Sequence, residues 1–200
     1  SVLNTLVKTV TKCLNDYDPT PAARAIQDFV NENLSNWYVR LNRKRFWGGG
    51  MTDDKLAAYQ TLYTCLETVV KLSAPFAPFI SDRIFTDLNA VSGRNNAESV
   101  HLADFPVVDE TLVNSELEEM MQIAQRVSSM VLALRRKVNI KVRQPLTKIL
   151  IPVLDPAMAR HIEAVKGLIM GEVNIKDIEL LNDTTGVITK RIKLNFKNFC

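Results

Sequence analysis

Residues 34–47 read Leu34-Ser35-Asn36-Trp37-Tyr38-Val39-Arg40-Leu41-Asn42-Arg43-Lys44-Arg45-Phe46-Trp47. The stretch holds four cations and four aromatic rings, and no acidic residue occurs between Asn33 and Thr52. At about 100° per residue along an α-helix, four of its residues fall on one ridge at i, i+4, i+7 and i+11: Asn36, Arg40, Arg43 and Trp47. A neighbouring apolar stripe can pack into a core: Ile26, Phe29, Val30, Leu34, Trp37 and Leu41. One helix thus combines an anchoring face with a cationic, aromatic face, which is typical of a helix that binds nucleic acid.

The bulk composition indicates a folded chain. Two hundred residues with 46% hydrophobic content suit one large domain or two small ones. The net charge is only +3, so an anionic partner must be argued from clustering of charge. A second basic cluster lies between Met120 and Leu154, where no acidic residue occurs: Arg126, Arg135, Arg136, Lys137, Lys141, Arg143 and Lys148. A solvated surface explains this second cluster equally well.

The cysteines and the hydropathy concern the compartment. Cys13, Cys65 and Cys200 are odd in number and contain no C-x-x-C motif, which favours a reducing compartment. No apolar run approaches about 18 residues, so we expect no membrane span and a cytoplasmic location. The chain begins in the middle of a helical pattern, and we expect it to be part of a longer protein.

Periodicity predicts a bundle of five helices followed by a smaller unit. The expected helices are residues 2–14, 20–47 with Thr20 as N-cap, 53–74 with Thr52 as N-cap, 80–88, and 115–138 with a capping box of Ser115 and Glu118. After Pro145 we expect strands at 147–153, 177–181 and 187–196 and a helix at 156–170. The predicted fold class is mainly α, a helical bundle over residues 1–144 followed by a small α+β unit over residues 145–200.

Catalytic signatures are lacking. Gly48-Gly49-Gly50 has no following Lys-Ser/Thr and joins two expected helices, so it is interpreted as a turn and not as a phosphate loop. His101 and His161 fall in different elements, and each is expected to be a loop or surface residue and not a base or metal ligand. We therefore predict no catalytic and no metal-binding residue in this chain.

Several motifs resemble one family. Residues 34–47 are similar to the signature helix of the class Ia aminoacyl-tRNA synthetases that activate isoleucine, valine and leucine. The isoleucine branch, that of the isoleucyl-tRNA synthetases, is resembled most closely through residues 74–80, 98–102, 104–106, 143–146, 172–176 and 194–197. In the last two motifs Val173 replaces the family's Leu and Leu194 its Pro.

The resemblance implies that this chain is the anticodon-binding helical bundle of a parent enzyme that joins isoleucine to tRNA(Ile) using ATP. The His-Ile-Gly-His and Lys-Met-Ser-Lys-Ser signatures of the family's ATP site are absent from the chain. ATP and Mg²⁺ are accordingly expected in the parent, with no cofactor in this chain. The implied partners are tRNA(Ile) and the catalytic domain of the same chain, and we expect a monomer.

Two candidate tRNA-binding surfaces follow. The first is the ridge of Asn36, Arg40, Arg43 and Trp47 with Lys44 and Arg45 at its margins. The second comprises Arg135, Arg136, Lys137, Lys141 and Arg143. Cations near a helix C-terminus also stabilise the helix dipole, which by itself accounts for one or two of the second set. Trp37, Tyr38 and Phe46 are assigned to the core.

Three alternatives stay open: a helical module that binds an acidic protein, a basic helix that lies on a membrane surface, and the equivalent domain of a valine–tRNA ligase.

Overall fold

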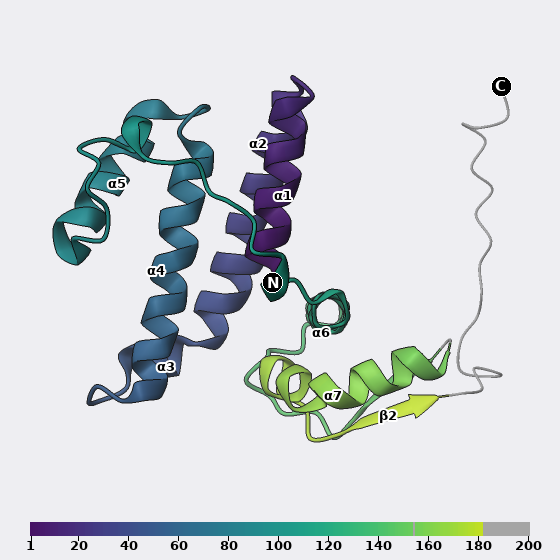
Figure 1. Cartoon of the computed structure of the whole chain (residues 1–200). Coiled ribbons are helices and arrows are strands. Elements are labelled where there is room, and N and C mark those ends of the chain that lie inside the picture. The colour runs from purple at the N-terminus through teal and green to yellow at the C-terminus, as the bar shows by residue number, and fades with distance from the viewer. Residues whose placement is uncertain (154, 182–200) are drawn as a thin grey trace, which may run out of the picture. The chain divides into compact units, whose positions relative to one another are not determined.

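The computed structural model describes residues 1–153 and 155–181 (Figure 1). Within it the chain divides into two compact units, residues 1–118 and 119–200. The predicted fold class, mainly α with a small α+β unit, is confirmed. The division falls inside helix α6 (Ser115–Lys137), whereas the domain boundary predicted from the sequence follows residue 144. Near the end of α6, Arg135 bonds to backbone carbonyls of the second unit, to which most of this helix belongs.

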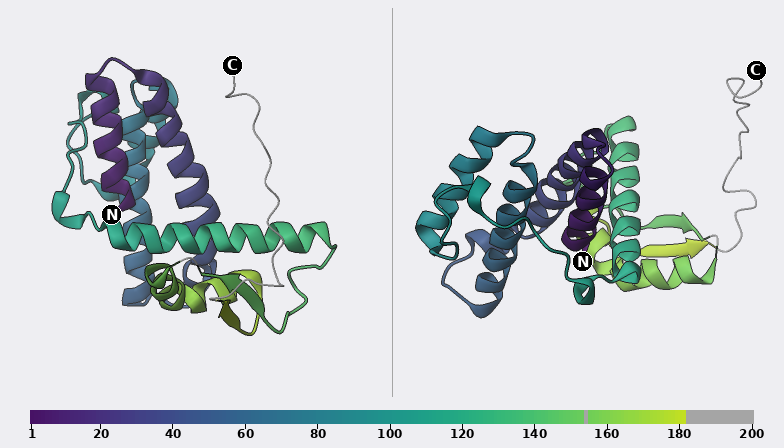
Figure 2. Two further views of the ribbon diagram at one scale, coloured as in Figure 1. Left: turned by 90° about the vertical axis from the view of Figure 1, so that its right-hand side faces the viewer. Right: turned by 45° about the horizontal axis from the view of Figure 1, so that its top comes forward.

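The first unit is helical. Its elements are α1 (Val2–Asn15), α2 (Pro19–Asp28), the π-helix η1 (Phe29–Val39), α3 (Arg43–Trp47), α4 (Asp53–Ser73), α5 (Pro78–Ser92), and the 3₁₀ turns η2 (Val100–Leu102) and η3 (Glu110–Leu112). α1, α2 and α4 pack side by side (Figures 1 and 2). Buried apolar side chains of these three helices and of η1 form one cluster, made of Leu6, Val7, Val10, Ala22, Ile26, Phe29, Leu34 and Leu72.

The predicted single α-helix over residues 20–47 is wrong in three respects. It starts at Pro19 and not after Thr20, because proline needs no N–H partner at the first helical position. From Phe29 to Val39 it winds as a π-helix, with backbone bonds that span five residues instead of four. It is then interrupted at Asn42 (φ −92°, ψ 7°), whose side-chain amide donates to the carbonyl of Tyr38 at 2.8 Å. Such side-chain bonds compete with regular helical bonding.

The helix ends in the rest of the unit are partly as predicted. Thr52 caps α4 by accepting a hydrogen bond from the Lys55 amide at 3.2 Å, as expected. The predicted capping box of α6 is wrong, because Asn114 accepts from the Leu117 amide at 3.0 Å. Glu118 instead accepts from Thr5 Oγ1 at 2.8 Å and so joins the first turn of α6 to α1 within the first unit.

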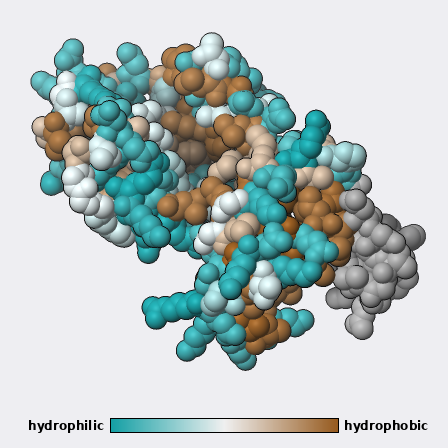
Figure 3. Space-filling view, turned by 90° about the horizontal axis from the view of Figure 1, so that it is seen from below, coloured by the Kyte–Doolittle hydropathy of each residue, from teal (hydrophilic) through white to brown (hydrophobic). Residues whose placement is uncertain are grey.

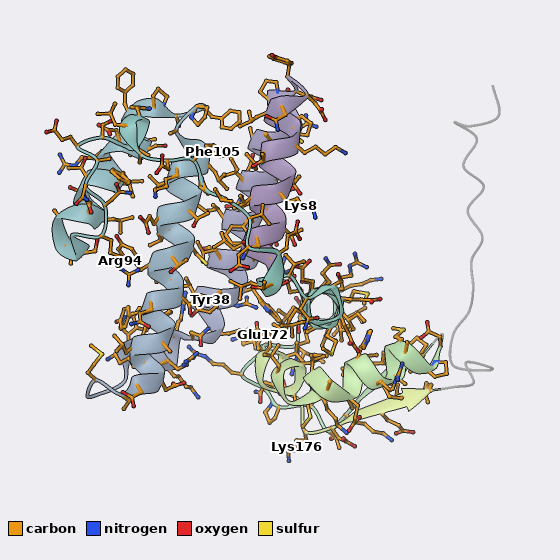
Figure 4. The ribbon with its side chains drawn as sticks, viewed as in Figure 1. Lys8, Tyr38, Arg94, Phe105, Glu172 and Lys176 are labelled. Carbon is orange, nitrogen blue, oxygen red and sulfur yellow. The ribbon has the colours of Figure 1, made fainter. Side chains whose placement is uncertain are left out.

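α5 is longer than the predicted helix 80–88. It ends at Gly93, whose left-handed conformation (φ 60°) favours glycine. Arg94 follows and points toward α4, where its guanidinium lies 4.7 Å from the ring centroid of Tyr63 (Figure 4).

The second unit holds a two-stranded parallel sheet. β1 (Ile149–Pro152) pairs with β2 (Ile178–Leu181) in the register Ile149–Ile178, and α7 (Pro156–Val173) connects the strands. The two predicted strands and the helix between them are confirmed, with shorter strands and a longer helix. The predicted turn at 182–186, strand at 187–196 and motif at 194–197 lie outside the described residues.

The two histidines differ in environment. His101 is exposed in η2, but His161 is only 8% exposed, so its predicted surface position is wrong. It lies one turn before Val165 on the buried stripe of α7. Within the described residues, no cluster of three or more His, Cys, Asp and Glu side chains is placed to hold a metal ion. Among the same residues, no helix has the length and apolar character to cross a membrane.

Candidate nucleic-acid interface

The aromatic residues of the quoted stretch anchor α3 to the bundle. Trp37 and Phe46 are each 8% exposed, and Tyr38 is half-buried, so their assignment to the core is confirmed. The hydroxyl of Tyr38, which Figure 4 labels beside α4, donates to the Ala58 carbonyl at 3.0 Å. The ring of Phe46 lies 5.1 Å from that of Tyr59. These contacts fix the short helix α3 in place, although five residues are too few to be stable alone.

Most of the predicted ridge lies at the surface. Asn36, Arg40, Arg43, Lys44 and Trp47 are all exposed, and the Trp47 indole is 77% exposed. Because of η1 and the break at Asn42, they do not follow one regular α-helix: Asn36 lies on the π-helix, Arg40 directly after it, and the other three on α3. The structure brings Arg43 and Trp47 together, with the guanidinium 5.8 Å from the ring centroid. That spacing is within the range of a cation–π contact.

Arg45 is placed differently from its neighbours. Its Nε donates to Asp54 Oδ2 at 2.7 Å, and its Nη2 donates to Asp54 Oδ1 at 2.6 Å. A third bond joins its Nη1 to Asn42 Oδ1 at 2.7 Å. The hydrogen bond to Asp54 raises the pKa of Arg45 above its usual value. Arg45 therefore holds α3 against α4 and has fewer donors left for a ligand.

No pairing of Arg45 with Asp54 is predicted from the sequence. The signal for the pairing was the run of basic residues followed, across a short glycine turn, by Asp53 and Asp54. Two helices joined by such a turn place the end of one beside the start of the next.

The glycine turn between α3 and α4 is held closely. Lys55 Nζ donates to the Gly48 carbonyl at 2.7 Å. A Cβ on Gly48 would lie 2.9 Å from the backbone oxygen of Lys44, which is too close for any side chain. Gly50 adopts φ 73°, where glycine is favoured. The turn is thus a defined connection that fixes the position of α3.

The second predicted surface contains one error. Arg135 is 2% exposed, so it does not belong to a surface, and it bonds to backbone carbonyls instead. Arg136, Lys137, Lys141 and Arg143 are exposed as predicted. In the part of the chain that the structure describes, none of these four cations forms an ion pair.

The exposed surface is chemically mixed. Seen from below, hydrophobic side chains lie among hydrophilic ones (Figure 3).

A family model for the anticodon-binding domain of tRNA ligases matches residues 1–151 of the chain. The chain belongs to this family. Both candidate surfaces of this anticodon-binding domain, residues 36–47 and 136–143, fall within the match.

Named relatives cover almost all of this anticodon-binding domain. An isoleucine–tRNA ligase of Bacteroides fragilis is 66% identical over 98% of the chain and 17% of the relative. The corresponding ligase of Cytophaga hutchinsonii is 61% identical over 98% of the chain and 18% of the relative. The isoleucine–tRNA ligase of Clostridium novyi is 43% identical over 98% of the chain and 18% of the relative. The chain thus spans less than a fifth of the length of these relatives. These comparisons do not support the alternative of a helical module for an acidic protein.

Proposed function

We propose that this chain is the part of an isoleucine–tRNA ligase that holds the anticodon stem and loop of tRNA(Ile). The parent would join isoleucine to tRNA(Ile) using ATP, as a monomer in the cytoplasm. The observation that carries this proposal is the 66% identity to a ligase of that name over 98% of the chain. The names of these relatives also favour isoleucine over the valine alternative.

The geometry of α3 suits the contact with RNA. Arg43 and Lys44 are exposed on a helix whose other side is anchored by Phe46, so both charges are presented from a fixed base. A planar guanidinium can bond two phosphate oxygens at once, and Lys44 can act as a point charge. Trp47, exposed beside Arg43, offers a face on which an unpaired base of the anticodon loop can stack.

The chain itself would perform no chemistry. ATP and Mg²⁺ would be bound elsewhere in the parent, as the resemblance to the family implies, because the sequence lacks the family's ATP signatures. The role of these residues is to bind and orient the nucleic acid.

The test uses the full-length protein with Arg43 and Lys44 both changed to Glu. We expect tRNA(Ile) binding to weaken strongly while formation of isoleucyl-adenylate stays unchanged, because the adenylate forms without tRNA. Wild-type protein that binds purified tRNA(Val) as tightly as tRNA(Ile) would contradict the isoleucine assignment. Loss of both activities in the variant would point to misfolding, which circular dichroism would reveal.

A further inference from the structure

The end of α6 and the segment that follows it form a basic loop, defined as residues 136–144. It carries Arg136, Lys137, Lys141 and Arg143 and no acidic residue. A loop of this charge could be a loosely solvated surface or a formed binding surface. The bonds that hold its backbone distinguish the two.

The start of the loop is fixed by the way in which α6 ends. Asn139 adopts the left-handed conformation (φ 55°), and its amide donates to the Arg136 carbonyl at 3.2 Å. The Ile140 amide donates to the Arg135 carbonyl at 2.9 Å. These two bonds form a Schellman motif, which satisfies the last carbonyls of the helix and sets the direction of the chain beyond it.

The buried Arg135 holds the other end of the loop. Its guanidinium donates to the carbonyls of Lys141 at 3.1 Å and Gln144 at 2.9 Å, and also to those of Val173 and Asn174, both at 3.0 Å. The last two lie at the C-terminal end of α7, where a cation also meets the negative end of the helix dipole. A buried charge is tolerated only when it is hydrogen-bonded in this way. Arg135 thus joins the loop to α7.

Asn174 adds a second connection. It ends α7 in the left-handed conformation (φ 52°), and its side-chain amide donates to the carbonyls of Val142 at 2.8 Å and Arg143 at 3.2 Å. Together Arg135 and Asn174 bond to four consecutive loop carbonyls, those of residues 141 to 144. With the carbonyls turned inward to these donors, the exposed side chains of Lys141 and Arg143 start from a fixed backbone.

We propose that Arg135 and Asn174 are positioning residues that hold the basic loop in the shape that binds the tRNA phosphate backbone, without contacting the RNA themselves. This inference rests on the proposed function for its ligand. Its physical basis is pre-organisation: a loop that is already ordered loses less conformational entropy on binding than one that must be ordered by the ligand.

Three variants distinguish the loss of loop order from the loss of an exposed charge. Asn174→Gly removes the two side-chain bonds yet suits the left-handed backbone, so α7 should still end where it does. Arg135→Met removes the four guanidinium bonds and keeps an unbranched side chain that replaces the aliphatic part of arginine. Lys141→Gln, the matched control, keeps both connections and removes one exposed charge.

In the full-length protein we expect both positioning variants to speed hydrogen exchange at the amides of Ile140 and Gln144, with α7 amides such as Ile169 unchanged. tRNA affinity should fall about tenfold, because ordering one backbone residue on binding costs about that factor. The slope of log affinity against log salt should stay at the wild-type value, since no phosphate contact is removed. In Lys141→Gln the slope should become less steep, with its magnitude reduced by about 0.7–0.9.

Normal tRNA binding by both positioning variants would overturn this inference alone. So would a fall of their salt slope by as much as in Lys141→Gln, which would make Arg135 or Asn174 a direct contact. A wild-type protein that binds no tRNA would overturn the proposed function, and the exchange rates would still report whether the two residues order the loop.

Discussion

Arg45 and Asp54 join α3 to α4 through a two-point ion pair, with donor–acceptor distances of 2.7 and 2.6 Å. The pair spans the glycine turn and aligns the guanidinium plane with the carboxylate, the geometry in which arginine binds most specifically. Its neighbours Arg43 and Lys44 make no ion pair among the described residues. One basic run therefore divides into a residue that holds the helix and residues that are available to a ligand.

This division predicts different salt dependences for the neighbouring cations. Arg43→Gln and Lys44→Gln should each reduce the magnitude of the slope of log tRNA affinity against log salt by about 0.7–0.9, the effect of one lost phosphate contact. Arg45→Gln should leave the slope near the wild-type value and instead speed hydrogen exchange at the Phe46 amide. Binding titrations at several salt concentrations give the slopes. An equal fall in all three variants would mean that Arg45 leaves Asp54 to bind RNA.

The two tryptophans should respond oppositely to truncation. Trp37→Ala removes a buried indole and should lower the free energy of unfolding by about 3–5 kcal/mol. Trp47→Ala removes an exposed one and should change it by less than about 0.5 kcal/mol. If an anticodon-loop base stacks on Trp47, the same variant should weaken tRNA binding by about 1–3 kcal/mol. Denaturant unfolding and tRNA titration measure the two effects, and unchanged tRNA affinity would exclude Trp47 from the interface.

The N-cap of α4 should contribute measurably to stability. Thr52→Ala removes the acceptor for the Lys55 amide and should cost about 1 kcal/mol in denaturant unfolding. Thr61→Ala is the matched control, because Thr61 lies exposed within α4 and its hydroxyl donates to the Ala57 carbonyl of the preceding turn. It should be neutral or slightly stabilising, since alanine favours helix interiors. Equal losses in the two variants would argue against a capping role.

Asp82 should make stability depend on acid pH. Its carboxylate accepts from Ser99 Oγ at 2.7 Å and from the Val100 amide at 2.9 Å, which lowers its pKa below the usual value. A lowered folded pKa means that the stabilisation is complete above the unfolded pKa, about 3.9, and is lost as the pH falls through the folded pKa.

The corresponding comparison is between wild type and Asp82→Asn. The gap between their free energies of unfolding should be widest near neutral pH and should shrink as the pH falls below about 4. Asp16→Asn, at the exposed end of α1, serves as the charge-matched control. A gap that is the same at pH 7 and at acid pH would show that charge on Asp82 is unimportant.

The sequence predicted those features that depend on local pattern. The amphipathic helices, the Thr52 cap and the burial of Trp37 and Phe46 each follow from residues close together in the chain. The different roles of the arginines do not follow from residues close together in the chain. Arg135 is buried because carbonyls some 38 residues later, at the end of α7, accept its donors, and Arg45 is held by a carboxylate on another helix. A basic side chain carries no local signal that separates these roles from a phosphate contact.

The sequence does not predict the π-helical winding of residues 29–39 either, because an apolar stripe fits a helix of either pitch over a few turns. An α-helix that loses one residue turns everything beyond the gap by about 100°. The π-helical turns of η1 contain more residues than α-helical turns, so a one-residue deletion there can be absorbed by tightening to ordinary α winding. A one-residue deletion should therefore be tolerated better within η1 than within an α-helix of the bundle, because α3 beyond it can keep its contacts with α4.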